Sequence, residues 1–179
     1  MSIEILNSKF GTAPVTMLGA RGGAAAARSA VRAEPALVFA VDATALTFEI
    51  ETLREKGRDV AVCQDLRQFS HLLGSPRRGR QGWSLVMVEI DGFGGIFNVI
   101  DKLLSLRQER PALPVILASK RLREHDLSTE RLPICDVSIA LPASAAELHL
   151  AVQRANRNNF AWQMNCAGIE DDEAAFPFE

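Results

Sequence analysis

The sequence is poor in cysteine, which excludes the classes of protein that cysteine holds together. Its 179 residues include only three cysteines, Cys63, Cys135 and Cys166, an odd number at wide spacing. Such a set fits neither a disulfide framework nor a zinc site. We therefore expect free thiols in a reducing cytoplasm, with Cys63 and Cys135 buried as small hydrophobic residues.

Long apolar runs and a strong net charge are also missing. No run approaches the roughly 20 apolar residues that a membrane-spanning helix requires. Glu4 stands where a signal peptide would carry basic charge, and no apolar region follows it. The net charge of −2 gives no reason to expect a nucleic acid as partner. We therefore expect a cytoplasmic protein without membrane or nucleic-acid partners.

The chain does have enough apolar residues for one globular domain. Hydrophobic residues make up 47% and charged residues 23% of it, as in ordinary globular proteins. Residues 1–34 are small and weakly patterned, so we expect a flexible N-terminal arm there. Residues 36–158 carry the pattern of a folded domain, and residues 159–179 are expected to form an acidic and aromatic C-terminal tail.

Short apolar runs alternate with segments of helical periodicity across residues 36–158. The runs predict five buried strands, at Leu37–Val41, Val60–Cys63, Leu85–Val88, Val115–Ala118 and Val137–Leu141. A helix is expected after each strand, starting near residues 46, 66, 96, 121 and 144. This alternation predicts a parallel sheet covered on both faces. The expected architecture is a flavodoxin-like (βα)5 doubly wound α/β fold with strand order 2-1-3-4-5.

Residues of chemical interest lie at the ends of four of these runs. Asp42 follows the first run, Glu89 the third and Ser119 the fourth, while Leu141 ends the fifth. The carboxyl ends of parallel strands open into one crevice, where α/β proteins bind ligands. The first and third strands are neighbours in the expected order, so Asp42 and Glu89 would face each other in this crevice.

The order and spacing of these residues closely resemble the receiver domains of two-component response regulators, the CheY-like superfamily. The resemblance covers residues 36–158. In that family the four positions hold an acidic pair, a phosphate-accepting aspartate, a threonine or serine, and a lysine. This chain has Ala43 for half of the acidic pair, Glu89 for the acceptor and Leu141 for the lysine. The proline after the lysine, which in the family commonly follows a cis peptide bond, is kept as Pro142.

The departures from the family fall on the residues that carry its chemistry. Magnesium requires near-octahedral oxygen ligands, for which only Asp42 and Glu89 remain as weak candidates. The carboxylate of Glu89 would sit about 1.5 Å deeper than that of an aspartate, a shift that can cost on the order of 100-fold in rate. Leu141 offers no cation to a phosphoryl group, and Ser138 replaces the family's aromatic switch residue.

The resemblance therefore implies a degenerate pseudo-receiver of a bacterial two-component system. We expect no enzymatic activity and no cofactor, with magnesium needed only if phosphorylation occurs. Surface contacts would then carry the signal, and the expected partner is another protein: a histidine kinase, an output domain or a second copy of the chain. A small flavodoxin-like enzyme is the less favoured class, because no nucleophile–base pair or cofactor motif stands out.

Receivers usually dock through the face made by their fourth helix, fifth strand and fifth helix. In this chain that face would include Ser138, Leu141, Ser144 and Glu147. Ser144 and Glu147 also have the spacing of a capping box at the start of the last helix.

Two alternatives stay open for the phosphorylation pocket. Asp91 could accept phosphate as a displaced acceptor, although it more simply caps or lines the turn at Gly92. Glu89 could imitate a phosphorylated acceptor permanently, although without the lysine we expect its carboxylate to pair locally or stay hydrated. Phosphate on Asp91 or Glu89 would make the chain an atypical phosphorelay receiver.

Overall fold

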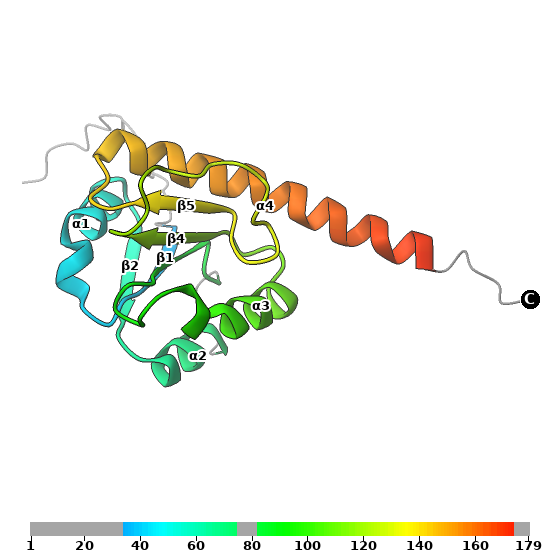
Figure 1. The fold of residues 1–179 in the computed structure, drawn as a ribbon, viewed down its shortest axis with the longest axis horizontal. Helices are drawn as coiled ribbons and strands as arrows, with labels where there is room; N and C mark the ends of the chain where they lie inside the picture. Colours follow the sequence, from blue (N-terminus) through cyan, green and yellow to red (C-terminus); the bar gives the residue numbers. More distant parts are fainter. Residues whose placement is uncertain (1–33, 75–81, 174–179) are drawn as a thin grey trace, which may run out of the picture. The chain divides into compact units, whose positions relative to one another are not determined.

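The chain folds around a five-stranded parallel sheet. The computed structural model describes residues 34–74 and 82–173, so the expected N-terminal arm lies, apart from Glu34, outside the described residues. The strands pair in the order β2-β1-β3-β4-β5 (Figure 1), which confirms the predicted flavodoxin-like topology. Their bounds are β1 Pro35–Phe39, β2 Asp59–Cys63, β3 Leu85–Glu89, β4 Val115–Ser119 and β5 Val137–Ala140.

Helices cover both faces of the sheet. The described residues contain two 3-10 helices, η1 Ala43–Leu46 and η2 Ile96–Asn98, and four α-helices, α1 Thr47–Glu55, α2 Leu66–Gly74, α3 Ile100–Glu109 and α4 Ala145–Glu173. Helices α1 and α4 pack on one face, and α2 and α3 on the other (Figure 1). None of the described helices has both the length and the apolarity that crossing a membrane requires.

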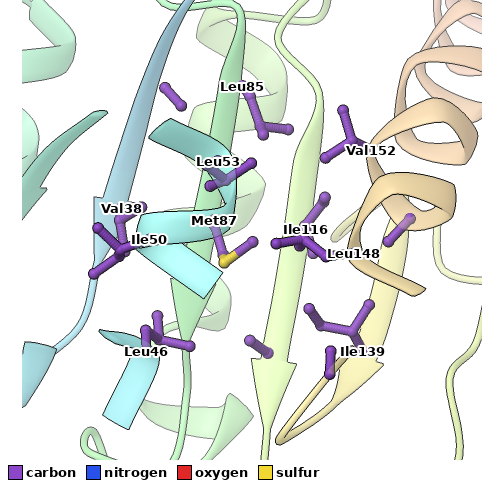
Figure 2. Packing of buried hydrophobic residues seen from close by; sticks show 14 of the residues in the cluster. Val38, Leu46, Ile50, Leu53, Leu85, Met87, Ile116, Ile139, Leu148 and Val152 are labelled. Atoms are coloured by element: carbon purple, nitrogen blue, oxygen red, sulfur yellow. The ribbon is translucent and has the colours of Figure 1, made fainter. Parts of the chain in front are cut away.

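The core consists of two apolar layers, one on each face of the sheet. Alternate residues of each strand point to opposite faces, so that Val38 and Met87 belong to one layer while Phe39 and Val88 belong to the other. Figure 2 shows the first layer, in which the side chains of α1 and α4 pack against the strands. Cys63 is buried as expected, and burial raises the pKa of its thiol to about 12.

The helix expected around Arg121–Arg131 is absent, and that prediction was wrong. Residues 120–136 form turns instead, with one antiparallel bridge between Asp126 and Ser138. The amide nitrogen of each residue donates to the carbonyl oxygen of the other, at 2.7 and 2.8 Å. β5 is an edge strand, and this bridge satisfies backbone groups that the edge would leave unpaired. The segment has no apolar stripe that a helix could bury, so pairing with the edge prevails.

The last helix continues through residues 159–173, which we had expected to lie beyond it as a tail. Asparagine is a poor helix former, yet α4 passes through Asn158 and Asn159. Both side chains are buried and bonded elsewhere in the domain. The Asn158 amide donates to the carbonyl oxygen of Asp136 at 2.7 Å, and the Asn159 amide to that of Pro111 at 2.9 Å. These tertiary bonds offset the low local propensity.

Candidate functional site

The carboxyl edge of the sheet brings the turns after β1, β3 and β4 close together. β1 ends at Phe39, two residues earlier than expected, so Asp42 lies in the turn into η1. Its Oδ1 accepts hydrogen bonds from the backbone nitrogen and the hydroxyl of Thr44, at 2.9 and 2.7 Å. These bonds lower the pKa of Asp42, and the positive charge of Lys120 adds to the effect. The side chain is exposed and serves as the N-cap of η1.

Glu89 is buried at the end of β3, and its carboxylate turns back onto the next two residues. Oε1 accepts from the backbone nitrogen of Asp91 at 2.8 Å, and Oε2 from that of Gly92 at 3.1 Å. The expected local pairing of Glu89 is therefore confirmed. A Cβ on Gly92 would lie 2.9 Å from Cβ of Val41 and 3.0 Å from Oε2 of Glu89, so this turn requires a residue without a side chain.

Asp91 connects the turn after β3 to the turn after β4. Its Oδ1 accepts a 2.6 Å hydrogen bond from the hydroxyl of Ser119, and its Oδ2 a 2.6 Å bond from the backbone nitrogen of Lys120. The Ser119 oxygen in turn accepts from the backbone nitrogen of Arg121, whose Nε lies 3.8 Å from Asp91 Oδ1. Asp91 thus bonds to the neighbouring turn, whereas we had expected it to cap or line its own turn at Gly92.

The position of the family's lysine is part of the core. Leu141 is 8% exposed and belongs to the apolar layer that α1 and α4 cover. The peptide bond from Leu141 to Pro142 is cis, as expected. A leucine carries no charge, so this position offers no cation to the crevice.

The expected docking face is only partly accessible. Ser138 is buried against Cys135, and Leu141 is buried in the core, so neither can contact a partner directly. Ser144 and Glu147 are exposed, and they form the predicted capping box. The Ser144 nitrogen donates to Glu147 Oε2 at 2.8 Å, and the Glu147 nitrogen to the Ser144 hydroxyl at 3.3 Å.

Sequence reasoning missed two side chains that fix this edge of the sheet. Glu49 on α1 is buried, and its Oε1 accepts from the backbone nitrogen of Ala143 at 3.0 Å. Nδ1 of His125 accepts from the backbone nitrogen of Ala140 at 3.0 Å, and its Nε2 lies 3.1 Å from Glu147 Oε1. Glu49 was detectable, because it falls on the same helical stripe as Leu46, Ile50 and Leu53. Nothing local in the sequence indicates the role of His125.

The described residues do not fit the magnesium site of the resembled family. The Asp42 carboxylate caps η1, and both Glu89 oxygens are occupied by backbone nitrogens. Within the described ranges 34–74 and 82–173, no group of three or more histidine, cysteine or acidic residues could hold a metal ion. An octahedral site needs several oxygen ligands that point to one centre. The carboxylates of Asp42 and Glu89 instead accept hydrogen bonds from backbone nitrogens of the neighbouring turns.

Neither a family model nor a curated protein sequence matches the chain. Solved structures do match its fold. A CheY-like response regulator receiver domain protein from Methanospirillum hungatei JF-1 matches with a TM-score of 0.52 at 13% identity, over 72% of this chain and 98% of that one. The signal receiver domain of an HD domain-containing protein from Pseudomonas fluorescens Pf-5 gives 0.52 at 19% identity, over 73% and 99%.

A longer protein contains the same fold as one of its parts. NtrX from Brucella abortus, in complex with ATP, matches with a TM-score of 0.54 at 18% identity, over 75% of this chain and 29% of that one. At such identities the similarity concerns the backbone alone. The chain therefore has the fold of response regulator receiver domains.

Proposed function

We propose that this chain is a two-component signalling protein that works as a phosphorylation-independent pseudo-receiver and regulates by docking on another protein. The observation that carries the proposal is that both possible phosphate acceptors are already engaged. Each carboxylate oxygen of Glu89 and Asp91 accepts a hydrogen bond from a neighbouring group. In this proposal the protein acts in the cytoplasm, is not an enzyme and needs no cofactor.

Glu89 is badly placed to attack phosphorus. Phosphoryl transfer depends on an acceptor oxygen held in line with the leaving group. The side chain of Glu89 is 3% exposed, and both of its oxygens face the backbone of the following turn. A phosphoryl group on Glu89 would break these bonds and leave the nitrogens of Asp91 and Gly92 without their acceptor, which is costly in a partly buried turn.

Asp91 already makes the kind of contacts that an anionic switch would create. A hydroxyl, a backbone N–H and the nearby Arg121 guanidinium all face its carboxylate. These donors are engaged in the unmodified chain, so added phosphate has little left to order. Leu141 and Ser138 are both buried, and neither can serve as the cation or the aromatic switch of a phosphate-driven transition.

The surface left for docking is the loop between β4 and β5 together with the first turn of α4. Arg123 and Glu130 are exposed on this loop, and Ser144 is exposed at the helix start. His125 joins the two parts, because it accepts a hydrogen bond from the Ala140 nitrogen and lies beside the Glu147 carboxylate. The loop and the first turn of α4 therefore form one continuous surface. A histidine kinase or an output domain is the kind of partner that this surface would take.

The phosphorylation assay is the direct test. The full chain is incubated with acetyl phosphate and magnesium, beside an active receiver domain as positive control, and its intact mass is measured. We expect no stable gain of one phosphoryl group. A gain that disappears in Asp91→Ala or in Glu89→Ala would overturn the proposal.

A second candidate, an atypical phosphorelay receiver that uses Asp91, is favoured by one observation. The Asp91 side chain is 17% exposed and lies beside the Ser119 hydroxyl, so part of its carboxylate can be reached from solvent. The same mass measurement separates the two candidates, because only this one predicts a phosphoryl group that depends on Asp91.

The docking surface has its own test, in which purified histidine kinases and output domains are the candidate partners. Arg123→Ala combined with Glu130→Ala should abolish capture of a partner that binds the wild-type chain. The matched control is Arg67→Ala, which changes an exposed residue on α2. Capture that survives the double variant would rule this surface out.

A further inference from the structure

The outer face of the second half of α4 exposes large apolar side chains that the domain does not cover. Phe160 is 63% exposed and Met164 58% exposed, and they lie one helical turn apart. The first half of the same helix buries Leu148, Ala151, Val152 and Ala155 against the sheet. Arg107 of α3 still stacks over Trp162, with its guanidinium carbon 5.1 Å from the ring centroid, and beyond this contact α4 extends past the end of the sheet (Figure 1).

Exposed residues on this outer face follow the spacing of a helix-pairing seam. Positions 153, 157, 160, 164 and 167 alternate steps of four and three residues, as the seam of a coiled coil does. Gln153, Arg157, Phe160, Met164 and Ala167 are all exposed. The buried stripe of Ala151, Val152 and Ala155 lies on the opposite side of the helix. α4 can therefore contact the sheet and a second helix at once.

We propose that this outer face pairs with the same face of a second copy of the chain, with the two α4 helices antiparallel. The register that centres the apolar residues places Phe160 of each copy against Met164 of the other. It also places Arg157 opposite Ala167. A two-fold axis relates the copies, so both Phe160–Met164 contacts form together.

The charges along α4 favour the antiparallel orientation. Arg154 and Arg157 are exposed, and neither has an ion-pair partner among the described residues. The last turn of the helix contains the acidic run Glu170–Glu173. Antiparallel pairing brings the basic segment of one copy beside the acidic segment of the other, whereas parallel pairing would place like charges together.

The contact rests on one short helix pair, so the dimer is expected to be weak. A single helix pair of this length should bury less than the roughly 1,200 Å² at which stable interfaces begin. We expect dissociation in the micromolar range, with a dependence on salt that reflects the charged ends. This inference deepens the proposed function, because it assigns a second copy as the partner of one particular surface.

Self-association of the full chain is measured by analytical ultracentrifugation across the micromolar range. The chain should be monomeric at the low end and dimeric at the high end. Phe160→Asp or Met164→Asp should weaken the dimer by about tenfold or more, because each buries an unpaired charge in the seam. Both residues are exposed in the monomer, so circular dichroism should stay unchanged.

The matched control is Phe48→Asp on α1, where the phenylalanine is 52% exposed away from the seam. It should leave the dimer intact. A chain that stays monomeric throughout, or a dimer that loses as much affinity from Phe48→Asp as from Phe160→Asp, would overturn the proposal.

Orientation is tested by cross-linking Arg157→Cys with Ala167→Cys in one chain that also carries Cys166→Ser. Antiparallel pairing predicts disulfide-linked peptides that join position 157 of one copy to position 167 of the other. Peptides that join 157 to 157 would instead indicate parallel helices and overturn the proposed register. A phosphoryl group gained in the mass assay would overturn the proposed function while leaving this dimer untouched, so the two failures are distinguishable.

Discussion

The hydroxyl of Ser119 donates a 2.6 Å hydrogen bond to Oδ1 of Asp91, and this bond joins the turns after β4 and β3. Oδ2 of the same carboxylate accepts from the backbone nitrogen of Lys120. One side chain thus bonds two turns that follow different strands. Groups of the chain itself therefore tie these two parts of the carboxyl edge together.

Removing either partner of this bond should destabilise the domain. Asp91→Ala leaves a hydroxyl and a backbone nitrogen without their acceptor, so we expect the free energy of unfolding to fall by about 1–3 kcal/mol. Ser119→Ala should cost about 1 kcal/mol. Urea unfolding of both single variants and the double variant gives the coupling between the residues, and strictly additive effects would show that the bond is not made in solution.

Arg107 and Asp136 form a fully buried ion pair between α3 and the start of β5. Arg107 Nη2 lies 2.7 Å from Asp136 Oδ1, and Asp136 Oδ2 also accepts from the backbone nitrogen of Val115. Asp136→Ala leaves a buried guanidinium without its counter-charge and should lower the free energy of unfolding by about 3–5 kcal/mol.

The exposed pair of Arg54 and Glu51 serves as the control for the buried pair, because solvent screens its attraction. Glu51→Gln should change the free energy of unfolding by about 0.5 kcal/mol or less. If Asp136→Ala and Glu51→Gln lowered the free energy of unfolding by the same amount in urea, the buried pair of Arg107 and Asp136 would stabilise the domain no more than the exposed one, which would contradict this prediction.

Glu147 should make the stability of the domain depend on pH in the acidic range. Hydrogen bonds from Ser144, with His125 beside it, lower the pKa of Glu147 from 4.5 to about 2. The folded state thus favours the carboxylate, so this contribution is fully present above pH 4.5 and is lost as the pH falls towards 2.

Glu147→Gln keeps the hydrogen-bonding shape of this side chain but cannot ionise. The difference between wild type and variant in urea midpoint should therefore shrink as the pH falls from about 5 to 2, most clearly at low ionic strength. The control is Glu55→Gln on α1, which also removes the charge of an exposed glutamate. It shows how far the loss of one such charge by itself changes the urea midpoint. A difference that stays constant over this range would refute the role given to Ser144 and His125.

Gly92→Ala should destabilise the turn after β3. The new Cβ would approach Cβ of Val41 to 2.9 Å, which lies close to the backbone and cannot swing away. We expect a loss of about 1–3 kcal/mol in the free energy of unfolding, as for other overpacked sites. Gly74→Ala is the control, because a Cβ there meets nothing within 4 Å. Thermal melts that fall equally for both variants would contradict the close packing of Val41 and Gly92.

Much of the architecture could be predicted because it depends on patterns within short segments. Apolar runs of four or five residues indicate strands that are buried on both faces, and five such runs separated by helical periodicity allow few parallel topologies. The capping box of Ser144 and Glu147 was readable for the same reason, since its two bonds join residues three positions apart. The buried state of Cys63 and Cys135 followed from their place in or beside strands.

The segment between β4 and β5 was mispredicted because a distant partner decides its structure. Asp126 bonds to Ser138 across the edge of the sheet, and this edge exists only once β5 has been placed. The length of α4 was underestimated for a related reason. Asn158 and Asn159 discourage a helix locally, and only their bonds to Asp136 and Pro111 keep them in it.

The residues that line the carboxyl edge of the sheet, and the charges that the site lacks, can be read from the amino-acid sequence. The roles of the remaining acids depend on the folded chain: Glu89 supports its own turn, and Asp91 bonds to Ser119 on the neighbouring one. Position along a strand is a local property, whereas the direction of a carboxylate depends on which donors the folded backbone brings within about 3 Å of it.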